Sequence, residues 1–112
     1  MTLALVLFGL AAVGGLVLAG IRFSGQPYPP LALAFVHGLF AASGLVALIL
    51  AITQAGAPDL AKISLLVFLM AAAGGFVLIS MHLRRIALPK GLVIVHALAA
   101  ISAFVLLLIA RS

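Results

Sequence analysis

Four long apolar runs follow one another along the chain, separated by short segments that carry Pro, Gly and charge. The runs cover residues about 2–21, 31–53, 60–83 and 91–110. A helix that crosses a bilayer needs about 20 apolar residues, and backbone groups in lipid must pair within their own segment. We therefore predict an all-α fold, an integral membrane four-helix bundle that forms a single transmembrane domain over residues 1–112.

The three breaks between the runs, residues 22–30, 53–59 and 84–90, contain residues that interrupt helices. Each break holds at least one Pro, which lacks the backbone N–H that a helix interior needs. Asp59 is expected to cap the third helix, because a carboxylate at this position accepts hydrogen bonds from the first free amides.

Composition supports a lipid environment. The chain is 68% apolar and 6% charged and has no Cys, whereas soluble proteins are roughly a quarter charged. The missing Cys excludes disulfides, thiolate metal sites and a Cys nucleophile. The net charge of +5 comes from basic residues at the edges of the apolar runs. We expect these residues to set membrane topology and not to bind nucleic acid.

The loop charges predict an orientation. An even number of helices places both termini and the second loop on one side of the membrane. The first and third loops carry four cations: Arg22, Arg84, Arg85 and Lys90. The opposite side carries Lys62 and Arg111 against Asp59. Cytoplasmic loops are the more basic ones, so we expect loops one and three in the cytoplasm and both termini outside. The expected location is a bacterial inner membrane.

The sequence also repeats itself. Residues 11–18 match 71–78 at six of eight positions, and residues 30–51 match 89–110 at ten positions, among them a Pro, a His and a Ser. Such self-similarity indicates a duplicated structural unit. We predict two copies of one helical hairpin, about 1–54 and 60–112, related by a pseudo-twofold axis along the membrane normal.

Two histidines recur under this repeat. His37 and His96 lie at the same predicted depth, and ionisable groups inside a membrane face the bundle interior. The same layer holds four glycines on the first and third helices: Gly14, Gly15, Gly74 and Gly75. In each histidine, we expect the ring nitrogen that binds no ligand to donate a hydrogen bond to a carbonyl of its own helix. Hydrogen-bonded packing histidines and glycines that let helices approach closely are the ordinary alternatives.

A symmetric His pair without a third ligand favours haem as the cofactor. Transition-metal ions usually take three or four protein ligands, whereas haem iron needs only two axial groups because the porphyrin supplies the others. The metal ligands would be His37 and His96. The four glycines would leave room for the flat macrocycle.

This arrangement resembles the b-type membrane cytochromes, notably the four-helix haem-binding core of the cytochrome b subunit of quinol:cytochrome c oxidoreductases. In that family the second and fourth helices carry axial histidines, and the first and third carry glycines against the haem. The resemblance covers nearly the whole chain. It implies a bis-histidine haem b that exchanges electrons with quinol or a partner redox protein.

One departure from the family limits the expectation to a single haem. Each ligating helix of the family core bears a second His about two heptads from the first. The positions 14 residues from His37 and His96 here are Phe23, Ala51, His82 and Ala110. Only one of these is a His, and it lies on the third helix. We therefore expect one haem b and no two-haem path across the membrane.

Other polar residues near the first and third loops have candidate roles. Arg22 and His82 are equivalent under the repeat and are predicted either to contact haem propionates or to extend to the membrane interface. Phe23, Gln26 and Tyr28 could border a quinone pocket.

Two further classes of function stay open. The length and helix count fit small four-helix multidrug transporters, but the first helix lacks the acidic residue on which those proteins depend. A cofactor-free structural subunit of a larger membrane complex is the other alternative. Of these classes, we expect an electron-transfer protein or subunit more than a stand-alone enzyme.

Overall fold

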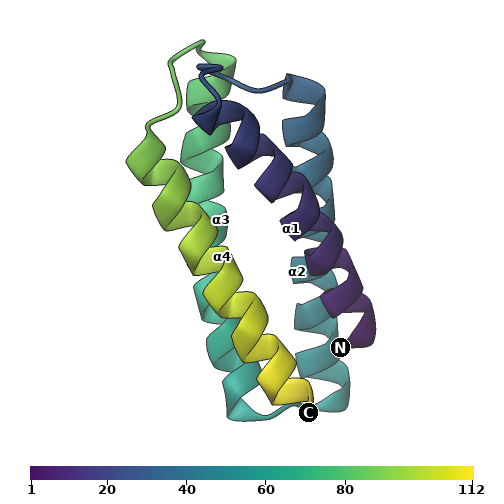
Figure 1. Ribbon diagram of the computed structural model, residues 1–112. Coiled ribbons are helices and arrows are strands. Elements are labelled where there is room, and N and C mark those ends of the chain that lie inside the picture. The colour runs from purple at the N-terminus through teal and green to yellow at the C-terminus, as the bar shows by residue number, and fades with distance from the viewer.

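A computed structural model describes residues 1–112 and contains four helices without any strand (Figure 1). The helices are α1 (Thr2–Phe23), α2 (Leu31–Ala55), α3 (Asp59–Leu83) and α4 (Lys90–Arg111). These bounds confirm the four predicted spans, with each end within two residues of its expected position. The apolar runs thus defined the helices well. Pro occupies the N-cap position of α2, α3 and α4, and Gly lies just after the end of α1 and α2.

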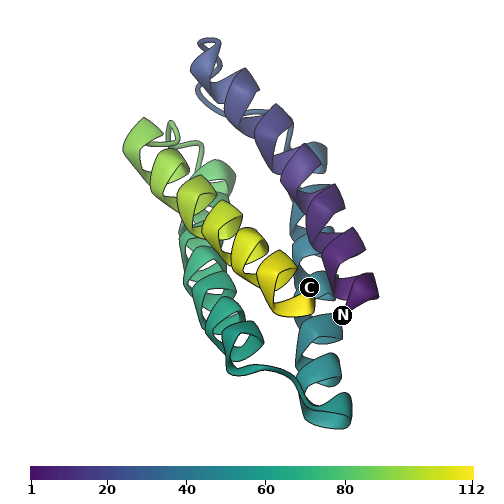
Figure 2. The same cartoon turned by 60° about the horizontal axis from the view of Figure 1, so that its bottom comes forward.

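The helices form two antiparallel hairpins. α1 packs mainly on α2 and α3 mainly on α4, while α1 also contacts α4 and α2 contacts α3. Both termini and the α2–α3 loop lie at one end of the bundle, and the α1–α2 and α3–α4 loops lie at the other (Figures 1 and 2). The predicted pair of hairpins is therefore present.

All four helices are long and apolar enough to cross a membrane. The bundle measures 43 Å along its longest axis, close to the roughly 40–45 Å of a bilayer with its headgroups. Large apolar side chains cover its outside, and Phe76 is 74% exposed. Such a surface is stable only in lipid, so the protein is an integral membrane protein.

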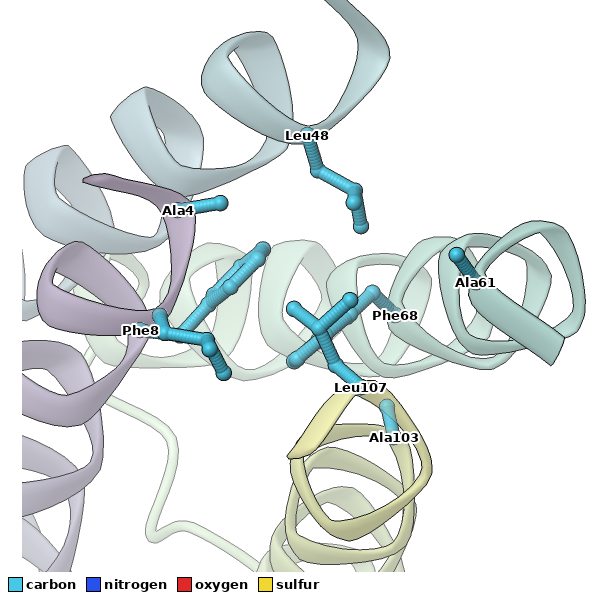
Figure 3. Close-up of a cluster of buried hydrophobic side chains, with 8 residues drawn as sticks. Ala4, Phe8, Leu48, Ala61, Phe68, Ala103 and Leu107 are labelled. Atoms are coloured by element: carbon cyan, nitrogen blue, oxygen red, sulfur yellow. The ribbon is translucent and has the colours of Figure 1, made fainter. Parts of the chain in front are cut away.

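The main apolar core lies toward the end that carries the termini (Figure 3). It combines residues of all four helices: Ala4, Leu5, Phe8, Leu48, Ala61, Phe68, Ala103 and Leu107. Phe8 and Phe68 are equivalent under the repeat, and so are Leu48 and Leu107. All four of these side chains are buried. The duplication therefore extends to the packing, and this core joins the two hairpins.

The start of α3 differs from the expectation for Asp59. Pro58 occupies the N-cap position, and Asp59 is the first helical residue and makes no capping hydrogen bond. Its carboxylate instead pairs with Lys62 Nζ at 3.3 Å on the exposed first turn. The helix begins one residue earlier than predicted, which moves the side chain past the position from which it could cap.

Candidate functional site

Two imidazoles face each other inside the bundle. His37 on α2 and His96 on α4 have ring centroids 6.1 Å apart and ring planes at 85° to each other. Both residues are half-buried. The predicted meeting of the two histidines across the pseudo-twofold axis is therefore present in the structure. α2 and α4 are diagonal neighbours, so this contact links the hairpins.

Each ring is fixed by one hydrogen bond to the neighbouring helix of its own hairpin. His37 Nδ1 donates to the carbonyl oxygen of Ala11 at 2.7 Å, and His96 Nδ1 donates to that of Ala71 at 2.8 Å. The expectation that these nitrogens bond to their own helices was wrong. A carbonyl has two lone pairs, so each alanine carbonyl can accept the imidazole as well as a helical amide.

These bonds determine which nitrogen carries the proton. A carbonyl oxygen only accepts hydrogen bonds, so Nδ1 must hold the hydrogen in both rings. In a neutral imidazole the other nitrogen, Nε2, then presents a free lone pair. The structure therefore holds two imidazoles in the tautomer that a metal can bind through Nε2.

The glycines of α1 and α3 explain how the rings reach these carbonyls. A Cβ on Gly15 would lie 2.9 Å from His37 Cε1, and one on Gly75 would lie 3.1 Å from His96 Cε1. At Gly14 and Gly74 the nearest atom is the Cβ of the same histidine, at 3.6 Å. The sequence pattern had indicated space for a flat cofactor here. The group that the glycines contact in the structure is the imidazole itself.

The histidine layer is closed on the side of the termini. Phe8 lies about one helical turn from Ala11, and its ring stacks on that of Phe68, with centroids 3.7 Å apart. Both rings belong to the apolar core described above. Buried apolar side chains therefore border the histidine layer at this end.

The two residues predicted as propionate contacts lie on the opposite side of the layer, toward the α1–α2 and α3–α4 loops. Arg22 is half-buried and donates from Nε to the carbonyl oxygen of Leu88 at 2.8 Å, without any further hydrogen bond. His82 is 8% exposed. Its ring makes no hydrogen bond and lies 6.0 Å from the ring of Tyr28. Both residues thus lie at the end where the sequence placed them, and Arg22 also fastens the α3–α4 loop.

The three residues named for a quinone pocket have separate surroundings. Tyr28 lies beside His82, whereas Phe23 lies 5.7 Å below Lys90 Nζ. Gln26 is exposed. No contact joins the three side chains into one lining.

The ligand set of the histidine layer consists of two imidazoles only. No group of three or more His, Cys, Asp or Glu side chains lies together in the protein. A metal held here must bring its remaining ligands with it, as haem iron does. Two imidazoles bonded to one metal at about 2 Å each have ring centres roughly 6 Å apart. The observed centroid separation of 6.1 Å matches this value.

Sequence reasoning missed the alanine carbonyls as part of the site. Ala11 and Ala71 are equivalent under the repeat and lie four residues before the second glycine of each pair. The repeat of the two alanines could be read from the sequence, but nothing in a side chain indicates that its backbone carbonyl accepts a hydrogen bond.

No family model matches the chain, and no curated protein or solved structure is significantly similar to it.

Proposed function

We propose that the protein is a membrane b-type cytochrome that binds one haem b through His37 and His96 as axial ligands. The observation that carries this proposal is the pair of oriented imidazoles, with Nδ1 bonded to backbone carbonyls and ring centroids 6.1 Å apart. The architecture also resembles the four-helix core of cytochrome b, with axial histidines on α2 and α4 and glycines on α1 and α3.

The hydrogen bonds on Nδ1 serve the proposed ligation directly. Metal-bound histidines nearly always donate their second ring N–H to a carbonyl or carboxylate, which fixes the ring and raises its basicity. The hydrogen bonds of the two rings involve Nδ1 only, so a packing role leaves both Nε2 nitrogens without a partner. The two rings and their two carbonyls therefore support a shared ligand more strongly than two separate packing roles.

Haem supplies a single-electron couple between ferric and ferrous iron when it is bound. The protein residues would hold both axial positions, which leaves no coordination site for oxygen or substrate. The buried Phe8–Phe68 stack gives the site an apolar border on one side. On the other side, Arg22 retains free terminal nitrogens, and His82 is available as well. We assign propionate contacts to these two residues, and electron exchange to quinol or a partner redox protein.

We further propose that the α1–α2 and α3–α4 loops face the cytoplasm of a bacterium, because four of the six basic residues lie in these loops or at the helix ends beside them. The chain has no Cys, so single Cys labels report topology without background. Ser24→Cys should react with a membrane-impermeant maleimide only after the membrane is opened. Gln54→Cys should react in intact spheroplasts. The reverse pattern would overturn this orientation.

Absorption spectroscopy tests the cofactor. Purified wild-type protein should show b-type bands that sharpen on reduction with dithionite. His37→Ala and His96→Ala should each lose the low-spin spectrum, and the double variant should retain no haem. His82→Ala is the control for axial ligation: it removes the only other His of the chain and, as a propionate contact, should lower haem affinity while the bound haem keeps the low-spin bands. A protein without reducible bands, or bands that survive the double substitution, would refute the proposal.

A further inference from the structure

We propose that the α3–α4 loop binds the headgroup of an anionic phospholipid through Arg84, Arg85 and Lys90, referred to below as the loop cations. This proposal does not depend on the cofactor. It rests on the charge of the loop, on a comparison with the equivalent loop of the first hairpin, and on the backbone conformation of Arg85.

The loop cations lack any acidic partner in the protein. All three residues are exposed. The only acidic residue of the chain, Asp59, begins α3 at the other end of the bundle and pairs there with Lys62. Three positive charges without an acidic partner therefore lie within seven consecutive residues, in the α3–α4 loop and at the first residue of α4. A ligand for this surface must carry negative charge.

The first hairpin shows that these charges are not needed to close the loop. Under the repeat, the positions of the loop cations correspond to Ser24, Gly25 and Leu31 in the first hairpin. α1 and α2 are nevertheless joined by a loop of similar length. At these three positions, therefore, only the second hairpin carries positive charge. The general preference for basic cytoplasmic loops would be served by either of them.

The backbone conformation of Arg85 also supports a function for this loop. Arg85 has φ of 56°, the only positive φ of a non-glycine residue in the protein. The equivalent residue, Gly25, also has a positive φ, of 115°. Glycine is the residue that favours this conformation, which ends a helix in the left-handed region. A charged residue kept in a strained conformation suggests that its side chain has a function.

The loop that carries the cations is held in place. Leu88 is buried, donates its amide to the carbonyl oxygen of Pro27, and accepts Arg22 Nε at its own carbonyl. Arg84 donates from Nε to the backbone carbonyl of Ser80 and from Nη2 to its hydroxyl. These contacts order the loop before a ligand arrives, which lowers the entropic cost of binding.

The position of the loop favours a lipid over a soluble anion. The loop joins two helices that span the membrane, so its cations lie at the depth of the headgroups. Next to them, Leu83 and Ile86 are 57% and 40% exposed and offer an apolar surface to acyl chains. A phospholipid satisfies both surfaces at once, whereas a free phosphate satisfies only the charges.

Native mass spectrometry of the detergent-solubilised full chain tests the proposal. The protein is titrated with phosphatidylglycerol and with phosphatidylcholine of the same acyl chains. Each cation near an anionic headgroup contributes roughly fivefold to affinity. The variant Arg84→Ser, Arg85→Gly, Lys90→Leu takes the residues of the equivalent loop, and its affinity for phosphatidylglycerol should fall by on the order of a hundredfold. Affinity for phosphatidylcholine should stay unchanged.

The controls separate this site from general attraction to the positive protein. Lys62→Gln with Arg111→Gln removes two cations from the opposite end and should keep the preference for phosphatidylglycerol. In the wild type, 0.5 M NaCl should abolish that preference, which tests the proposal without any substitution. The proposal fails if the triple variant keeps the preference or if salt leaves it intact. It also fails if glycerol 3-phosphate competes as well as the lipid, because the site would then recognise a soluble phosphate.

Discussion

The rings of Phe8 and Phe68 lie face to face in the interior of the bundle, with centroids 3.7 Å apart and planes within 6° of parallel (Figure 3). They come from α1 and α3, which are diagonal helices, and they are equivalent under the repeat. The pseudo-twofold axis therefore runs through the stack. His37 and His96 make the corresponding contact between the other two helices, α2 and α4. One contact in each layer thus joins the two hairpins across the axis.

Loss of either stacked ring should destabilise the bundle strongly. Phe8→Ala or Phe68→Ala leaves a cavity in the only large apolar cluster, and such changes cost about 3 to 5 kcal/mol. The measurement is reversible unfolding in mixed detergent micelles. Phe76→Ala, at a lipid-facing position that is 74% exposed, should cost much less. If the double variant loses the sum of the two single losses, the rings do not stabilise each other as a pair.

Gly44 should be intolerant of even one added methyl group. A Cβ at this position would lie 2.9 Å from Cδ1 of Phe8, and the movement of that ring is restricted because it stacks on Phe68. We expect Gly44→Ala to cost about 1 to 3 kcal/mol from overpacking. A Cβ added at Gly38, on the same helix, would meet nothing within 4 Å, so Gly38→Ala should leave stability unchanged or raise it. Equal effects of the two substitutions would contradict the packing described for Phe8.

The sequence predicted the helices and the hairpin repeat because lipid imposes a strong rule on the chain. Every backbone group must be paired within a helix, so only long apolar runs bounded by Pro and Gly are possible. The repeat then placed His37 and His96 at one depth, and the structure confirms that they meet. The position of a residue along its helix determines its depth in the membrane and the side of the helix on which it lies. For His37 and His96 this information was enough to predict that they meet.

Contacts between helices were harder to predict. In a helix of a soluble protein, the contrast between a polar and an apolar face shows which side is buried. A membrane helix is apolar on all sides and gives no such contrast. Phe8 and Phe68 therefore did not stand out from the other apolar residues, although both recur under the repeat. The acceptors of the histidine rings were missed for a related reason. Sequence spacing does not fix how a neighbouring helix is rotated, and the carbonyl of Ala11 is reached only at one rotation.

Arg85→Gly should stabilise the protein. Arg85 holds a φ of 56°, and replacing a residue in this conformation by glycine typically gains about 0.5 to 1 kcal/mol. The converse substitution, Gly25→Ala in the equivalent loop with φ of 115°, should be destabilising by a similar or larger amount. Thermal unfolding in one detergent, without added lipid, compares both variants with the wild type. A loss of stability in Arg85→Gly would mean that its side chain makes a stabilising contact within the protein.

Gly15→Ala and Gly75→Ala should displace the rings of His37 and His96 while both imidazoles stay in the protein. The new methyl group would lie 2.9 Å from Cε1 of His37 or 3.1 Å from Cε1 of His96, distances that force the ring to move. Each ring would then be displaced from its position against the alanine carbonyl, which weakens the hydrogen bond that fixes the tautomer a metal needs. Weakened support of this kind typically lowers metal affinity about 10- to 100-fold.

The ratio of Soret to protein absorbance measures this effect during titration with haem. Gly14→Ala and Gly74→Ala are matched controls, because a Cβ there would meet the histidine Cβ at an ordinary 3.6 Å. These variants should bind haem as the wild type does. Gly15→Ala should have the larger effect of the two, since its contact is the shorter. Should all four substitutions reduce haem binding alike, the glycines would act by general helix packing and not by positioning the imidazoles.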